Sequence, residues 1–197
     1  MKTPVSSRLD GVVLSVAKLV CVVSNIMLCM SSHGSHDAVR PVLDIHAMIN
    51  GFVVEAVQDV PEARMVEQPC SIVNHPAWTL SHLNAYSGML LAILDDASVS
   101  NPDAEMERFG YGSTPVSDHG AYATKRELLD RFRERNARLA EVVAAKHSGY
   151  FHKPPPERFH PTPTVGHLAI TLLVAHPAHH LGQLKQWRRA AGMAGKA

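Results

Sequence analysis

The sequence predicts an all-α protein that folds as one four-helix bundle. In four segments the apolar residues recur at three- and four-residue steps, as in an amphipathic helix, and no segment keeps the two-residue alternation of a strand. Stretches rich in Pro, Gly, Ser and Asp separate these segments. With 197 residues the chain has room for one ordinary domain. We therefore expect residues 37–193 to form the bundle and residues 1–36 to be an apolar N-terminal extension.

The first helix is expected from about Asp37 to Val60, with Pro61 at or just beyond its end. Its apolar positions form one stripe, which we expect to face the core: Val42, Ile45, Ile49, Phe52, Val53, Ala56 and Val60.

The second helix is expected from about Asn74 to Asp96. Asn74 is a suitable N-cap, and Pro76 is tolerated in the first turn because amide donors there have no intrahelical acceptor. The stripe of this helix consists of Trp78, Leu83, Leu90, Leu91 and Leu94.

A long loop, from Ala97 to His119, separates the second helix from the third, which we expect from about Ala121 to Lys146. Loops of this length inside a compact domain are often functional or required by the topology. The third helix has an apolar inner face, and its Arg, Lys and Glu residues crowd an outer face that we interpret as solvated surface. The inner face consists of Leu128, Leu129, Phe132, Leu139, Val142 and Val143.

The last helix is expected from about Pro163 to Ala191. Gly149 and three consecutive prolines break the chain before it, and Thr162 followed by Pro163 resembles an N-cap with proline at the first helical position. Gly192 is a suitable terminator.

Composition excludes several classes of function. The formal net charge is +1, so no strong field favours nucleic acid. Three cysteines, Cys21, Cys29 and Cys70, do not make a disulfide framework for a domain of this size, which suits a reducing compartment. The sequence contains no P-loop, dinucleotide fingerprint or GxSxG elbow.

The N-terminal segment from Val12 to Met30 is largely apolar, and Lys2 and Arg8 precede it. It has three readings: a signal peptide, a membrane anchor, or residues upstream of a true translation start at Met30. We favour the third reading because Lys18 interrupts the apolar run and no clean cleavage site follows. The expected location is therefore cytoplasmic, with export or membrane anchoring through residues 12–30 as the alternative.

Two histidines, His176 and His180, are spaced to share one ligand. Four residues of helix turn about 400° and rise about 6 Å, so both imidazoles leave the same face. Neutral imidazole suits zinc, nickel or iron at roughly 2.0–2.2 Å. His82 lies one turn after Trp78 among apolar neighbours, where a polar ring needs a partner. It is either a core histidine bonded to a carbonyl or the third ligand of a site that leaves a coordination position open, as catalytic sites do.

These residues also carry a resemblance. The stretch from Asn74 to Leu83 resembles the second-helix signature of the DinB/YfiT-like superfamily. The stretch from His176 to Arg189 resembles its last-helix signature. The resemblance covers about Asp37 to Met193. It implies a bundle in up-down-down-up order with the long loop between helices two and three. It also implies a divalent metal at His82, His176 and His180 and frequent homodimers. Characterised members of the superfamily that this sequence resembles include S-transferases and isomerases that use small cellular thiols.

Pro177 qualifies the site because it removes the amide hydrogen bond back to Leu173, so we expect the helix to open locally there without separating His176 from His180. Among the other polar residues, we interpret His46 and His75 as boundary residues, with lining of the cavity as the alternative, and His179 as a boundary residue rather than a fourth ligand. We interpret Tyr86 as the best polar neighbour of the ligands and Gln183 as a hydrogen-bonding residue within the bundle.

Two functions remain open, and no catalytic residue is assigned, since no carboxylate stands at a ligand-like spacing. The first is a metal-dependent enzyme that transfers or rearranges a group with a low-molecular-weight thiol as co-substrate, or that performs metal-assisted hydrolysis. The second is a non-catalytic, stress-related bundle that binds metal or dimerises.

Overall fold

The computed structural model describes residues 39–95, 102–159 and 161–193, and these residues form helices, turns and connecting segments without a strand. The expectation of an all-helical protein is therefore confirmed. The expected extension, residues 1–36, lies outside the described residues, as does the apolar stretch from Val12 to Met30. No described helix is both long enough and apolar enough to cross a membrane.

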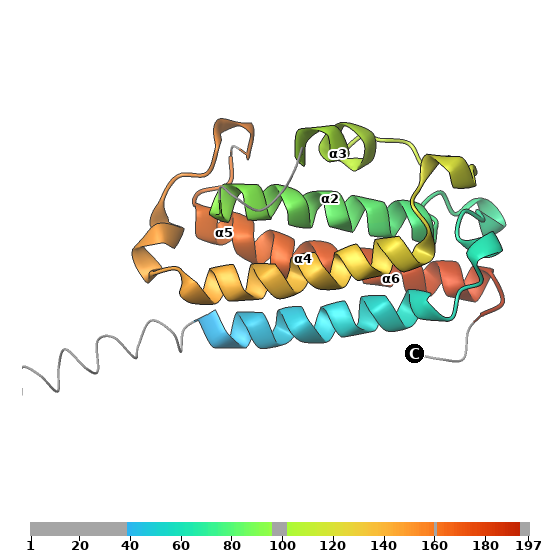
Figure 1. The fold of residues 1–197 in the computed structure, drawn as a ribbon, viewed down its shortest axis with the longest axis horizontal. Coiled ribbons are helices and arrows are strands. Elements are labelled where there is room, and N and C mark those ends of the chain that lie inside the picture. The colour runs from blue at the N-terminus through green and yellow to red at the C-terminus, as the bar shows by residue number, and fades with distance from the viewer. Residues whose placement is uncertain (1–38, 96–101, 160, 194–197) are drawn as a thin grey trace, which may run out of the picture. The chain divides into compact units, whose positions relative to one another are not determined.

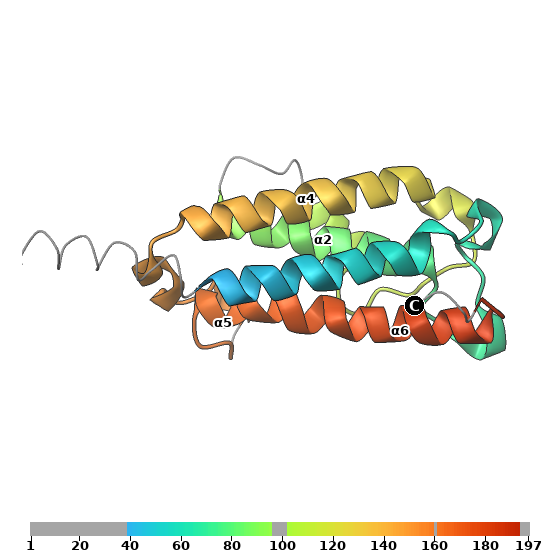
Figure 2. The same cartoon turned by 90° about the horizontal axis from the view of Figure 1, so that it is seen from below.

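Long helices run lengthwise beside one another in both views (Figures 1 and 2). The first is residues 39–58, and the others are α2 (Pro76–Leu94), α4 (Lys125–Ala145) and a rod made of α5 (Val165–Ile170), the π-helical turn η6 (Thr171–Ala175) and α6 (His176–Ala190). The shorter α3 (Pro102–Phe109) packs against α2. Single turns of 3₁₀ helix lie at Glu62–Arg64, Pro69–Ser71, His119–Ala121, Ser148–His152 and Glu157–Phe159.

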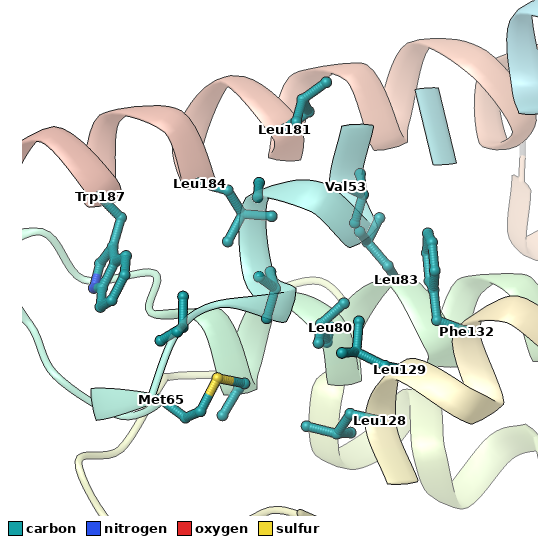
Figure 3. Packing of buried hydrophobic residues seen from close by; sticks show 14 of the residues in the cluster. Val53, Met65, Leu80, Leu83, Leu128, Leu129, Phe132, Leu181, Leu184 and Trp187 are labelled. Atoms are coloured by element: carbon teal, nitrogen blue, oxygen red, sulfur yellow. The ribbon is translucent and has the colours of Figure 1, made fainter. Parts of the chain in front are cut away.

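The main core lies where the first helix, α2, α4 and α6 meet (Figure 3). Val53, Leu80, Phe132, Leu184 and Trp187 are each 0–1% exposed. The indole N–H of Trp187 donates to the carbonyl of Glu67 at 2.7 Å, so its polar atom is satisfied inside the core. The apolar stripes of the sequence therefore provide the faces that meet there.

The stripe of the first helix is narrower than expected. Ile49, Val53 and two further members are buried, but Ile45 and Phe52 are each 43% exposed. Ile45 and Phe52 are a heptad apart, so they share one side of the helix, at the flank of the buried stripe. The ring of Phe52 instead lies 5.5 Å from the ammonium nitrogen of Lys185. Including these two residues in the core was wrong.

The expected long loop contains a helix, α3, over Pro102–Phe109. Proline at its start, Asp103 and Glu105 in its first turn and Arg108 in its last turn are favourable signals. Eight residues are too few for a stable isolated helix, so packing decides whether it forms. Glu105 supplies that packing with a bidentate ion pair to Arg135 of α4, at 2.5 and 3.1 Å.

Three helix starts also differ from expectation. His75, not Asn74, caps α2: its Nδ1 accepts from the N–H of Trp78 at 3.2 Å. The helix expected from Ala121 begins at Lys125, after a capping box between Thr124 and Glu127. Similarly, the last rod begins at Val165, with Thr164 as its cap. In each case a side chain close to the expected start accepts a hydrogen bond from an amide N–H that has no acceptor within the helix.

Candidate metal centre

The histidines predicted from the sequence, His82 of α2 and His176 and His180 of α6, come together between these helices. The Nε2 atom of His176 lies 2.9 Å from Nε2 of His82 and 3.1 Å from Nε2 of His180. All three candidate ligand atoms lie within 4.8 Å of one another. His82 and His180 are buried, at 6% and 5% exposure, and His176 is half-buried.

The hydrogen bonds on the far side of two rings define which nitrogen carries a proton. Nδ1 of His82 lies 2.6 Å from the carbonyl oxygen of Phe109, and Nδ1 of His180 lies 2.8 Å from Oε1 of Gln183. Because both oxygens only accept, each Nδ1 carries the hydrogen and donates it. In the neutral rings of His82 and His180, Nε2 therefore presents a lone pair to the centre of the site.

This donor set fits a divalent cation. The lone pairs of His82 and His180 both face Nε2 of His176. A proton on that nitrogen can form a hydrogen bond to only one of them at a time. A metal at about 2.0–2.1 Å from each nitrogen with tetrahedral angles separates the nitrogens by about 3.3 Å, close to the 2.9 and 3.1 Å between Nε2 of His176 and the other two. A cation at this point satisfies all three nitrogens together.

The protonation of the site also favours metal binding. Burial, followed by the neighbouring charges of His180 and His82, lowers the pKa of His176 to about 3. Burial, followed by the charge of His82, lowers the pKa of His180 to about 4. Burial also lowers the pKa of His82. All three imidazoles are therefore neutral at neutral pH, which is the form that binds a metal.

Aromatic rings enclose the three histidines. Trp78 stacks on His82 with 4.6 Å between the ring centroids, and Tyr86 lies 4.7 Å from His82 and 4.5 Å from His176. The indole N–H of Trp78 donates to the hydroxyl of Ser113 at 3.2 Å, and Tyr86 hydrogen-bonds to the backbone of Tyr111. The last residue of α3 and the segment that follows it, residues 109–113, therefore lie against the site through contacts with α2.

Gln183 connects the site to the start of α2. Its Oε1, besides accepting from His180, accepts from Nδ2 of Asn74 at 3.0 Å. Its Nε2 donates to His179 at 3.0 Å, so the exposed His179 lies outside the triad, as expected. His75 faces elsewhere, with its Nε2 at 3.0 Å from the carbonyl oxygen of Val116. A carbonyl partner for His82 was expected only as the alternative to metal binding, and the role of Asn74 was not anticipated.

The helix opens locally before Pro177 while both neighbouring histidines stay together, which confirms the expectation for this proline. The turn η6 is π-helical, and the N–H of His176 donates to the carbonyl of Thr171. Pro177 has no N–H for the Leu173 carbonyl four residues back. Nδ1 of His46 lies 2.9 Å from that oxygen and supplies the missing hydrogen. A π-helical turn of this kind often marks a functional site.

His46 is therefore a structural partner of the site's helix, and its interpretation as a boundary residue was wrong. It is 2% exposed. Carbonyl oxygens face both ring nitrogens, that of Leu173 at 2.9 Å from Nδ1 and that of Asn136 at 3.4 Å from Nε2, and the shorter contact places the hydrogen on Nδ1. Nε2 then accepts from Nδ2 of Asn50 at 3.0 Å. The period of the first helix places residue 46 beside the stripe, but the partner, a backbone carbonyl 127 residues away, leaves no pattern in the sequence.

Acid should destabilise the metal-free protein through its buried neutral histidines. Burial lowers the pKa of His46 and of His75 below the ordinary value of 6.5, against the smaller effect of their hydrogen bonds to carbonyls. The folded pKa lies below the unfolded one, so this stability is fully present above about pH 6.5 and is lost as the pH falls toward the folded values. Urea denaturation in chelator should show the free energy of unfolding falling below pH 6.5.

The control for this prediction is His46→Asn, which retains a donor for Leu173 but does not titrate. Its free energy of unfolding should fall less steeply with acid than that of the native sequence. Identical slopes for the two proteins, or a native protein that gains stability below pH 6.5, would contradict the assignment of a buried neutral His46.

Comparison with known proteins identifies the family. The family model described as DinB superfamily matches residues 53–184, a range that includes all three histidines of the site. No curated protein and no solved structure matches this chain. The matched range spans more than half of the chain and runs from the first helix into α6. The chain therefore belongs to the DinB superfamily.

Proposed function

We propose that this protein is a metal-dependent enzyme whose His82, His176 and His180 hold one divalent ion of zinc, nickel or iron. The observation that carries the proposal is the convergence of three Nε2 atoms, two of which present lone pairs because their Nδ1 hydrogens are donated elsewhere. Three protein ligands leave a coordination position open, the arrangement of catalytic metal sites.

The reaction we propose is transfer or isomerisation with a low-molecular-weight thiol as co-substrate. A bound divalent ion would supply the Lewis acid that holds a thiol as its thiolate at neutral pH. Tyr86 packs on two of the three rings, and burial raises the pKa of its hydroxyl, so this group keeps its proton at neutral pH. Tyr86 is therefore the candidate hydrogen-bond donor to a substrate.

The test combines metal analysis with a substrate screen. Elemental analysis of the purified chain should find about one divalent ion per chain, and a screen of cysteine or glutathione against electrophilic acceptors should find turnover that a chelator removes. Tyr86→Phe should lower kcat while leaving the metal content unchanged. Metal-loaded protein that turns over no thiol with any acceptor would exclude the thiol-dependent reaction.

A non-catalytic bundle is the second candidate, and the cover over the triad favours it. The ligands are covered by Trp78, Tyr86 and residues 109–113. Among the described residues, the candidate metal ligands are three histidines, and no Asp, Glu or Cys joins them. In that case metal should raise the melting temperature of the protein without generating any turnover.

We also propose a cytoplasmic homodimer of up-down-down-up bundles. The long connection between α2 and α4, from Asp95 to Thr124, supports this helix order. Ile45, Met48 and Phe52 are 43–54% exposed on one side of the first helix, and this apolar side supports dimerisation. Light scattering coupled to size-exclusion chromatography should give twice the chain mass, and Met48→Glu should halve it.

A further inference from the structure

A second candidate site, with none of the three metal ligands in its lining, is a cavity of about 300 Å³ between α2, α3, α4 and the turn that precedes α4. This volume is at the lower end of the range, roughly 300–1,000 Å³, of sites for small molecules. Arg108 and Phe109 of α3, Arg131 of α4 and Tyr122 are among its lining residues. Nothing in the proposed metal chemistry uses this cavity.

Positive charge exceeds negative charge around the cavity. Glu105 is the acidic residue of the lining, and Arg135 already takes both of its oxygens, at 2.5 and 3.1 Å. Arg131 lies at a longer 3.4 Å from the same carboxylate. Arg108 donates to the carbonyl of Ala121 at 2.9 Å and forms no ion pair with any carboxylate in the described residues. Two guanidinium groups therefore have donors that a further anion can use.

The rest of the lining is aromatic and apolar. The rings of Phe109 and Tyr122 lie nearly parallel, with 5.9 Å between centroids and 29° between planes. Leu128, 2% exposed, contributes an apolar side chain from α4. Burial raises the pKa of Tyr122, so its hydroxyl stays neutral beside the arginines. The cavity therefore offers contacts both to a flat apolar group and to a negatively charged group of one ligand.

We infer that this cavity binds a small organic acid, with its carboxylate on Arg108 and Arg131 and its flat apolar part beside Phe109 and Tyr122. The inference does not depend on metal binding or on the proposed enzymatic reaction. Two arginine side chains recognise a carboxylate by charge-assisted hydrogen bonds, and the same carbon skeleton without the charge lacks those bonds.

The experiment titrates the full chain with benzoate and with its neutral counterpart benzamide, by isothermal calorimetry or ligand-observed NMR. Benzoate should bind at least tenfold more tightly than benzamide. Arg108→Gln/Arg131→Gln should weaken benzoate binding at least tenfold and leave benzamide unchanged. Circular dichroism verifies that each variant is folded.

Arg133→Gln is the matched control. Arg133 is on the same helix but about 200° around it from Arg131, is exposed, pairs with Asp130 and does not line the cavity. Its loss should leave benzoate affinity unchanged. Equal weakening by Arg133→Gln, equal affinity for benzamide, or no benzoate binding at millimolar concentration would overturn the inference. Inorganic phosphate that binds as tightly as benzoate would overturn the role of the aromatic rings.

Discussion

Replacing His176 and His180 together with alanine should reduce the metal content from about one ion per chain to none. The two residues supply two of the three nitrogens that converge in the site, and the imidazole of His82 alone does not hold an ion tightly. The expected loss of affinity is several orders of magnitude. Elemental analysis after dialysis against a weak chelator measures it.

His179→Ala is the control for this variant. His179 is on the same helix, its ring lies edge-on to that of His180 with 5.3 Å between centroids, and its nitrogen bonds to Gln183 and is not among the three that converge in the site. The control protein should retain about one ion per chain. A double variant of His176 and His180 that is folded by circular dichroism and retains its full metal content would exclude the triad as the binding site.

His46→Leu should lower both the stability of the protein and its affinity for metal. The carbonyl of Leu173 would lose the donor that compensates for Pro177, and a buried carbonyl without a partner costs about 1–3 kcal/mol. The affected carbonyl is in the π-helical turn that leads directly into His176. We expect metal affinity to fall by about tenfold, the lower end of the usual effect of residues that support metal ligands. Urea denaturation and metal titration measure the two effects.

Two further variants separate the hydrogen bond from the loss of the ring. His46→Asn keeps a donor at a similar position and should restore most of the stability and affinity. His46→Leu/Pro177→Ala returns a main-chain N–H to the helix and should recover part of both. If neither variant recovers anything, the carbonyl of Leu173 does not need the donor and the role assigned to His46 is wrong.

The bundle elements and the triad followed from periodic patterns within single helices. The stripe containing Val53 and the inner face containing Phe132 are buried as expected, because a helix with one apolar face must pack that face inward. The spacing of His176 and His180 placed both rings on one face, and His82 was added by its position among apolar residues together with the resemblance. These features are local, or repeat along one element, and a sequence displays them directly.

The features that the sequence did not display depend on distant partners. Helix α3 is short, and its formation depends on contacts such as that of Glu105 with Arg135, 30 residues away. Pro177 indicated that a carbonyl would lose its amide donor, but not that His46 would provide the replacement. The period of the first helix also did not distinguish the buried Val53 from its exposed neighbour Phe52, since packing against α4 and α6 decides between them.

Main-chain carbonyls, those of Phe109 and Leu173, orient His82 and His46. Every amino acid carries this carbonyl, so a substitution at position 109 or 173 leaves the oxygen in place as long as the backbone path is unchanged. A one-residue insertion or deletion in the segment between Glu105, which pairs with Arg135, and Phe109 would instead move the oxygen away from His82. The orientation of the ligand should therefore tolerate changes of residue type in this segment and depend strictly on its length.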